Sequence, residues 1–198
     1  MKKLTIIFAL CLALAGANTV RAAPTFVIDF ESLADLDIVD DQFLALGADF
    51  GGTASILRAG ASLSSAFPPK SGSNVIFDDP QLGSGIIRVD AVGLPWAMAG
   101  AFVTGNTDVT LKAYASDGSL LGSASTGGAN YVGAGTGLSP NIFLSVSAPG
   151  IAYVEFSDTG NTYVVDDFTF QAIPAPGAIL LGGIGVGLVG WLRRRRTL

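Results

Sequence analysis

The sequence predicts an all-β domain, built as a single antiparallel β-sandwich. Between residues 23 and 173, short runs of β-branched and aromatic residues alternate with clusters of Gly, Ser, Asn, Asp and Pro, at the spacing typical of sandwiches and barrels. No long stretch of this region has helical periodicity. About 150 residues are enough to bury one sizeable hydrophobic core.

The expected strands follow from those runs. Thr25–Phe30 predicts the first strand, and residues 35–46 predict a short helix or an irregular loop. We expect further strands at residues 49–51, 55–58, 74–77, 85–89, 96–103, 109–115, 120–125, 141–147, 151–156 and 162–170.

Two turns predict which strands are neighbours. Asp117-Gly118 separates the strands 109–115 and 120–125, and Asp-Gly is favoured where a tight hairpin requires positive φ. Residues 157–161 include a glycine and predict a second, longer hairpin between the strands 151–156 and 162–170.

The first 22 residues predict a secretory signal peptide. Lys2 and Lys3 precede an apolar run over residues 4–15, and Val20 and Ala22 occupy the small-residue positions before an expected cleavage after Ala22. The alternative is an uncleaved membrane anchor, which the shortness of the apolar run disfavours.

The central domain is acidic and lacks the residues of the common catalytic centres. All 16 acidic residues lie between Asp29 and Asp167, and the basic residues there are four, which gives the domain a net charge of −12. Those basic residues are Arg58, Lys70, Arg88 and Lys112. We therefore expect no binding of nucleic acid, because phosphate would be repelled.

The chain has no histidine, and its one cysteine, Cys11, lies in the signal peptide. Ser-His-Asp, Cys-His and histidine-zinc centres are therefore excluded, and we expect no enzyme. A carboxylate pair that hydrolyses glycosides, drawn from residues such as Glu31 and Glu155, is an open alternative.

The C-terminal residues 174–198 form a third region. Pro174, Ala175 and Pro176 precede the apolar run Gly177–Leu192, which as a helix spans about 24 Å, short of the ~30 Å of a bilayer core. The arginines that follow favour the cytoplasmic side and leave the β domain outside. These arginines are Arg193, Arg194, Arg195 and Arg196. The alternative is an ordinary single-span anchor.

This combination resembles the PEP-CTERM sorting signal of Gram-negative bacteria that make exopolysaccharide, with Ala175 where the family name has Glu. The resemblance implies export, transient membrane insertion, and cutting near residues 174–176 by an exosortase-type processing enzyme. The protein would then reach the cell surface or the extracellular matrix.

The central domain also resembles exported domains often joined to this tail, which are similar to the jelly-roll sandwiches of carbohydrate-binding modules. The resemblance implies a jelly-roll-like fold. The segments that carry it are Ile28-Asp29-Phe30-Glu31, residues 41–47, Lys112-Ala113-Tyr114, Pro149-Gly150-Ile151 and Val165-Asp166-Asp167-Phe168.

The last strand predicts a buried carboxylate. Strict alternation places Val164, Asp166, Phe168 and Phe170 on one face, so that Asp166 points with the core phenylalanines. A buried carboxylate needs a cation or several N–H donors.

Calcium (Ca2+) is one solution to that requirement, and in modules of this type structural calcium often lies near where the chain ends meet. We hypothesise a calcium site led by Glu31 and Asp166, with Asp29 and Asp167 as further ligands. The alternative is that Asp166 accepts backbone N–H groups while Glu31 is solvated.

Sugar binding requires an exposed aromatic side chain with polar neighbours. The candidates are Trp96, Tyr114, Tyr131, Tyr153 and Tyr163, and Tyr131 is the one expected to be exposed because it lies in the Gly-rich segment 127–137. The sequence therefore predicts a surface or matrix protein without catalysis, acting within or against exopolysaccharide. The alternatives are a specific carbohydrate-binding module with structural calcium and a glycan-active enzyme.

Overall fold

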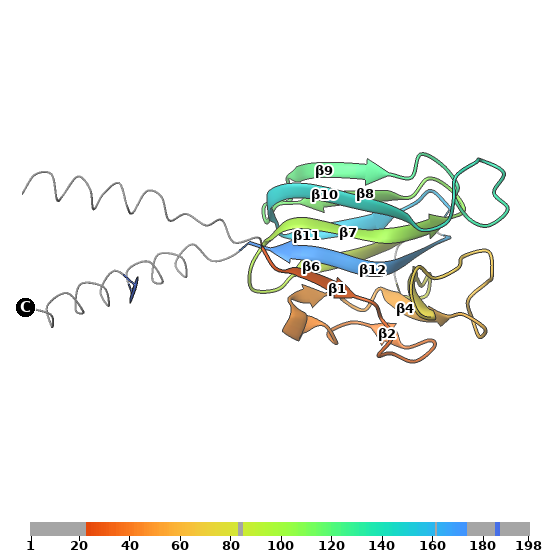
Figure 1. Cartoon of the computed structure of the whole chain (residues 1–198), viewed down its shortest axis with the longest axis horizontal. Coiled ribbons are helices and arrows are strands. Elements are labelled where there is room, and N and C mark those ends of the chain that lie inside the picture. The colour runs from red at the N-terminus through yellow and green to blue at the C-terminus, as the bar shows by residue number, and fades with distance from the viewer. Residues whose placement is uncertain (1–22, 83–84, 161, 174–184, 187–198) are drawn as a thin grey trace, which may run out of the picture.

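The computed structural model describes residues 23–82, 85–160, 162–173 and 185–186. Its domain is a sandwich of two antiparallel sheets with a single short 3-10 helix among those residues, which confirms the predicted fold class (Figure 1). The predicted signal peptide, the Pro-Ala-Pro segment and the arginines lie outside the described residues, as does the predicted C-terminal helix apart from Gly185 and Val186. Within the described part of the chain, no helix has the length and apolar character needed to cross a membrane.

One sheet has seven strands. Its order is β10-β7-β12-β5-β4-β2, and β1 also pairs with β12. In chain order the bounds are β1 Thr25–Ile28, β2 Ile38–Val39, β4 Ala54–Arg58, β5 Asn74–Asp78, β7 Trp96–Gly105, β10 Ile142–Ile151 and β12 Tyr163–Ala172.

The other sheet has five strands in the order β3-β6-β11-β8-β9. The bounds are β3 Ala48–Asp49, β6 Ile86–Ala91, β8 Thr110–Tyr114, β9 Leu120–Ser125 and β11 Tyr153–Ser157. The segment 35–46, expected as a short helix or an irregular loop, contains β2 and the 3-10 helix η1 (Leu44–Leu46) joined by turns.

The first predicted hairpin is confirmed and the second is wrong. β8 and β9 pair across Asp117-Gly118, where Gly118 has φ 82° and Ser119 N–H donates to Asp117 Oδ1 at 2.9 Å. In contrast, β11 and β12 belong to different sheets, so the connection after Ser157 crosses between the layers. Turn composition marks a change of direction but does not decide with which strand the chain pairs afterwards.

Tyr163 ties the two layers together. It begins β12 in the seven-stranded sheet, and its hydroxyl donates to the Phe156 carbonyl at 2.7 Å and accepts from Ile87 N–H at 3.0 Å in the five-stranded sheet. Burial raises its pKa far above that of an ordinary tyrosine. Its hydroxyl therefore stays neutral and completes the hydrogen bonding of β6 and β11.

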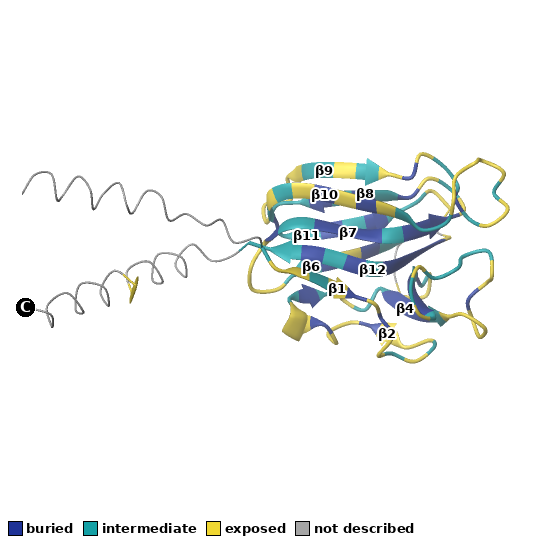
Figure 2. Ribbon diagram, in the orientation of Figure 1, coloured by how far each residue is buried: buried dark blue, intermediate teal, exposed yellow. Residues whose placement is uncertain are grey.

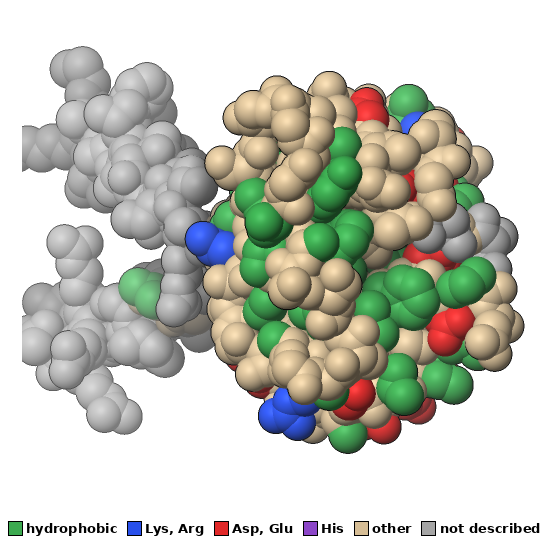
Figure 3. Space-filling model, turned by 90° about the vertical axis from the view of Figure 1, so that its right-hand side faces the viewer, with side chains coloured by type: hydrophobic (Ala, Val, Ile, Leu, Met, Phe, Trp, Pro, Cys, Tyr) green, Lys and Arg blue, Asp and Glu red, His purple; other side chains and the backbone are tan. Residues whose placement is uncertain are grey.

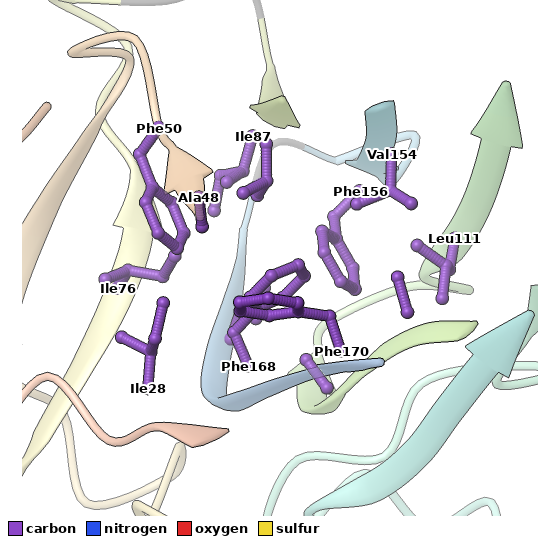
Figure 4. Close-up of a cluster of buried hydrophobic side chains, with 14 of the residues drawn as sticks. Ile28, Ala48, Phe50, Ile76, Ile87, Leu111, Val154, Phe156, Phe168 and Phe170 are labelled. Carbon is purple, nitrogen blue, oxygen red and sulfur yellow. The ribbon is translucent and has the colours of Figure 1, made fainter. Parts of the chain in front are cut away.

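The core lies between the sheets, and phenylalanines of β12 occupy its middle (Figure 4). The Phe168 ring packs against Phe50 and Trp96 at centroid distances of 5.7 and 5.6 Å, and against Phe156 at 6.3 Å. With no cysteine in the described domain, this apolar packing holds the two layers together.

A bulge in β12 changes which face its side chains occupy. The pairing with β7 shifts register between Asp166 and Thr169, and Asp167 has φ 46°. Val165 faces the core before the bulge and Phe168 after it, whereas strict alternation requires the opposite faces for these two residues. The prediction that Asp166 points with the core phenylalanines is therefore wrong.

Candidate functional site

Two of the predicted acidic residues hold one loop segment from two sides. Asp166 Oδ2 accepts N–H groups of Lys70 at 2.6 Å and Ser71 at 3.1 Å, and Glu31 Oε1 accepts those of Ser73 at 2.8 Å and Asn74 at 2.7 Å. We call Glu31, Asp166 and the segment 70–74 the carboxylate clamp. The two residues that were expected to lead a calcium site thus bind neighbouring parts of one loop segment.

The place of the clamp follows from the edges of β12. One edge pairs with β7, whereas the other pairs with β5 at residues 164–165 and with β1 at residues 168–171. The bulge lies in the interval between β5 and β1. Glu31 follows β1 closely and the segment 70–74 leads into β5, so both reach the bulge from the chain on either side of it.

The other two predicted ligands lie close by but have partners of their own. Asp29 Oδ1 accepts the N–H of Glu31 at 3.2 Å, and Asp167 Oδ1 accepts the hydroxyl of Ser71 at 2.7 Å. Among the described residues, no group of three acidic, cysteine or histidine side chains is arranged to hold a metal ion. The backbone N–H contacts of Asp166 match the alternative to calcium, although Glu31 also accepts such contacts; calcium binding stays a prediction.

Asp166 is a buried carboxyl group with a raised pKa. Only 1% of the residue is exposed, and burial raises its pKa to about 6. The N–H donors of Ser71 and Lys70 oppose this rise, while the neighbouring charge of Asp167 adds to it. The clamp therefore contains a carboxyl group that gains a proton only slightly below neutral pH.

Gly72 is required where the clamp closes. It has φ 53°, and a Cβ atom there would overlap the Glu31 carboxylate. A residue with a side chain would therefore both strain the backbone and displace Glu31.

Tyr131 is half-buried, which corrects the expectation of an exposed ring. It stacks on Phe67 with a centroid distance of 6.0 Å, and Val132 N–H donates to the Ala66 carbonyl at 2.9 Å. The Gly-rich segment is thus attached to the loop that precedes β5. Figure 3 views this end of the sandwich, where apolar side chains lie near the centre and carboxylates lie at the rim.

The other aromatic candidates divide between the core and one outer face. Trp96 and Tyr163 are fully buried, whereas Tyr114 and Tyr153 are half-buried on the outer face of the five-stranded sheet. Sequence reasoning preferred Tyr131 to this pair. The signal that identifies the face is polar alternation: Arg88 with Asp90, Lys112 with Tyr114, and Tyr153 with Glu155, each two residues apart.

Three of these side chains stack across three neighbouring strands. The rings of Tyr114 on β8 and Tyr153 on β11 are 4.8 Å apart at an interplanar angle of 14°. Arg88 Cζ on β6 lies 3.8 Å from the Tyr153 centroid. Asp90 holds that guanidinium with two contacts, Nε to Oδ2 at 2.7 Å and Nη2 to Oδ1 at 2.6 Å. We call Arg88, Asp90, Lys112, Tyr114, Tyr153 and Glu155 the stacked face.

Charges on the stacked face are balanced, unlike those of the domain. It contains two basic and two acidic side chains, and Glu155 lies opposite both Arg88 and Lys112 in the strand register. The hydrogen bonds that Arg88 donates to Asp90 raise the pKa of Arg88. Burial, followed by the charge and hydrogen bond of Glu155, raises the pKa of Tyr114. These six residues thus offer aromatic surface and hydrogen-bonding groups with no net charge among them, and Asp49, which lies opposite Asp90 in the strand register, adds one carboxylate beside them.

The carboxylates named for the enzyme alternative lie in different layers. Glu31 belongs to the clamp beside the seven-stranded sheet, whereas Glu155 lies on β11 in the five-stranded sheet. These two do not face one another across a cleft, as hydrolysis by a carboxylate pair requires.

Among the comparisons with known proteins, only the comparison with solved structures finds matches. No family model matches the chain, and no curated protein matches it. One solved structure that aligns with it is a Family 29 carbohydrate-binding module, CBM29_1, from Piromyces equi, at 12% identity and a TM-score of 0.40 over 77% of this chain and 93% of that one. Another is a DUF4465 family protein from Bacteroides caccae, at 12% identity and a TM-score of 0.42 over 80% of this chain and 97% of that one.

Proposed function

We propose that this protein is exported to the cell surface or the extracellular matrix, where it binds exopolysaccharide through the stacked face and catalyses no reaction. The N-terminal signal and the C-terminal resemblance to a PEP-CTERM tail support export. The absence of histidine from the chain and of cysteine beyond Cys11 supports a binding role.

The observation that carries the proposal is the Tyr114–Tyr153 stack among balanced charges. Tyr114 and Arg88, which come from the strands on either side of β11, cover the two faces of the Tyr153 ring, so a sugar would contact the edges of the stacked rings. The tyrosine hydroxyl groups remain able to form hydrogen bonds. Arg88, Lys112 and Glu155 supply donors and acceptors for sugar hydroxyls at the edges of the rings. A locally neutral face within a domain of charge −12 fits a polymer rich in hydroxyl groups and poor in charge.

The test is binding of the domain to purified exopolysaccharide from the producing cells. Tyr153→Ala removes the central ring of the stack and should weaken binding at least about tenfold, since full burial of a large apolar side chain contributes about 1.5–3 kcal/mol. Tyr131→Ala is the matched control at the other aromatic position. Equal loss in both variants, or none in Tyr153→Ala, would refute the assignment to the stacked face.

The tail requires a separate measurement. We expect the intact mass of the protein recovered from its producing cells to match a chain that begins near Ala23 and ends near residues 174–176, after an exosortase-type enzyme has acted. Replacement of Arg193–Arg196 should leave the longer form in the membrane. A mature wild-type product that retains Trp191 and the arginines would indicate a plain anchor.

A further inference from the structure

Four exposed apolar side chains lie at the end of the sandwich where β1 begins and β12 ends. They are Leu44 and Leu46 of η1, 40% and 44% exposed, and Val92 and Leu94 of the connection between β6 and β7, 38% and 44% exposed. Figure 2 shows both segments as exposed at that end. We call these four residues the apolar end.

The two segments are joined by backbone contacts. Val92 N–H donates to the Gly47 carbonyl at 3.0 Å, and Ala48 pairs with Ala91 in the strand register. The four side chains thus belong to one connected surface and not to two separate loops.

The chain leaves the domain beside this surface. Ile173 N–H donates to the Pro95 carbonyl at 3.0 Å, one residue after Leu94. In the sequence, the apolar run begins at Gly177, so three residues separate it from Ile173. An extended chain covers about 14 Å over that interval, which keeps the domain end close to wherever the run is inserted.

The charge distribution favours lipid as the occupant. The connections at this end cover residues 40–47, 92–95, 115–119 and 148–152, and the charged residues in them are Asp40, Asp41 and Asp117. The domain as a whole carries −12, and carboxylates are visible on the opposite end in Figure 3. Thirteen of the 16 carboxylates of the domain lie outside these connections, which limits the charge that must be desolvated when this end approaches a lipid surface.

We infer that the apolar end rests on the membrane, with its leucines at the boundary between headgroups and acyl chains, while the C-terminal run is inserted. The inference rests on the membrane insertion that the proposed function assigns to the tail. Exposed leucines gain free energy by leaving water for this boundary, and the short tether removes most of the entropic cost of bringing them there. The stacked face begins beside this end, where the Tyr153 hydroxyl lies near Gly118, and extends along the outer flank of the five-stranded sheet.

The experiment uses the chain from Ala23 to Leu198 in vesicles of phosphatidylcholine and phosphatidylglycerol. This chain contains no cysteine, so Leu94→Cys provides a single position for a polarity-sensitive fluorophore, and Ser65→Cys provides the control at the opposite end. We expect nitroxide-labelled lipids to quench the label at residue 94 at least about fivefold more than the label at residue 65.

A paired substitution tests whether the leucines are responsible. Leu44→Ser with Leu46→Ser, in the Leu94→Cys background, should lower the docked-to-undocked ratio about tenfold or more, since each removes apolar surface from the contact. Leu36→Ser with Ile38→Ser is the matched control, because these residues are 64% and 47% exposed and lie outside the apolar end. That control should leave the quenching unchanged.

Each contrary outcome has its own signature. Protein that floats with the vesicles but shows a solvent-like label at residue 94 would overturn docking and leave the anchoring intact. Self-quenching that grows with protein density would show that copies pair through this end, which also overturns the inference. Protein that does not float would overturn the inference together with tail insertion, whereas polysaccharide binding measured on the same sample tests the stacked face independently.

Discussion

The carboxylate clamp and the stacked face use the same residue types in opposite environments. Asp166 is buried and accepts backbone N–H groups, whereas Asp90 is 41% exposed at its side chain and binds the guanidinium of Arg88. A carboxylate that satisfies backbone donors fixes the path of the chain. One that holds another side chain in place on an exposed face arranges a surface that a ligand can reach.

The largest expected effect is the pH dependence of the clamp. Because burial raises the pKa of Asp166 from 3.8 to about 6, the folded chain holds this proton more tightly than the unfolded chain. Stability from this group is therefore greatest below pH 4 and is lost as the pH rises through 6, by about 3 kcal/mol in total.

Asp166→Asn keeps an acceptor for Lys70 N–H and does not titrate. Urea unfolding of both proteins between pH 4 and pH 8 checks the prediction. The difference between their free energies of unfolding should change between pH 4 and about pH 6 and should level off at higher pH. A constant difference would show that the environment of Asp166 does not favour its protonated form.

Gly72→Ala should destabilise the protein by about 2 kcal/mol, from a left-handed backbone and a weakened Glu31 contact. Gly60→Ala is the matched control, because Gly60 also has positive φ but no atom lies within 4 Å of its added Cβ. Thermal unfolding should place the Gly72 variant clearly below the Gly60 variant. Equal losses would mean that the backbone conformation alone accounts for the effect.

Calcium binding would make the clamp a ligand site in addition to a structural contact. If Glu31 and Asp166 bind it, adding calcium to chelator-treated protein should stabilise the fold by about 1.4 kcal/mol at tenfold excess over the dissociation constant. Glu31→Gln should abolish the gain in melting temperature. An unchanged melting temperature in the wild-type protein would leave the clamp with backbone partners alone.

The smallest effect on stability is expected at the stacked face. Asp90→Ala should change the free energy of unfolding by less than about 1 kcal/mol, since its ion pair with Arg88 is exposed. It should nevertheless weaken polysaccharide binding, because the guanidinium loses the partner that holds it on Tyr153. Isothermal titration calorimetry together with thermal unfolding separates the two effects. A large loss of stability would show that Asp90 stabilises the fold, as the clamp carboxylates do.

Much of this fold could be predicted where the deciding interactions are local. Alternation and turn composition located most of the strands, and Asp117-Gly118 identified β8 and β9 as partners because a tight hairpin leaves no other pairing. Glu31 and Asp166 were expected to share a calcium site, and both bind the segment 70–74, while calcium binding itself stays a prediction. The Tyr114–Tyr153 stack was not preferred over Tyr131, because the side chains come from strands separated by more than 30 residues.

The sequence by itself determined the all-β class, the acidic charge of the domain and the absence of histidine and cysteine chemistry from it, since these depend on composition and short-range pattern. Only the tertiary structure decided the face of Asp166, the layer that β12 joins and the partners of the tyrosines. Side chains alternate between the two faces of a strand only while its hydrogen-bonded pairing with the neighbouring strand is uninterrupted. The bulge at Asp166 and Asp167, which arises where β1 and β5 share one edge of β12, depends on contacts that no local pattern records.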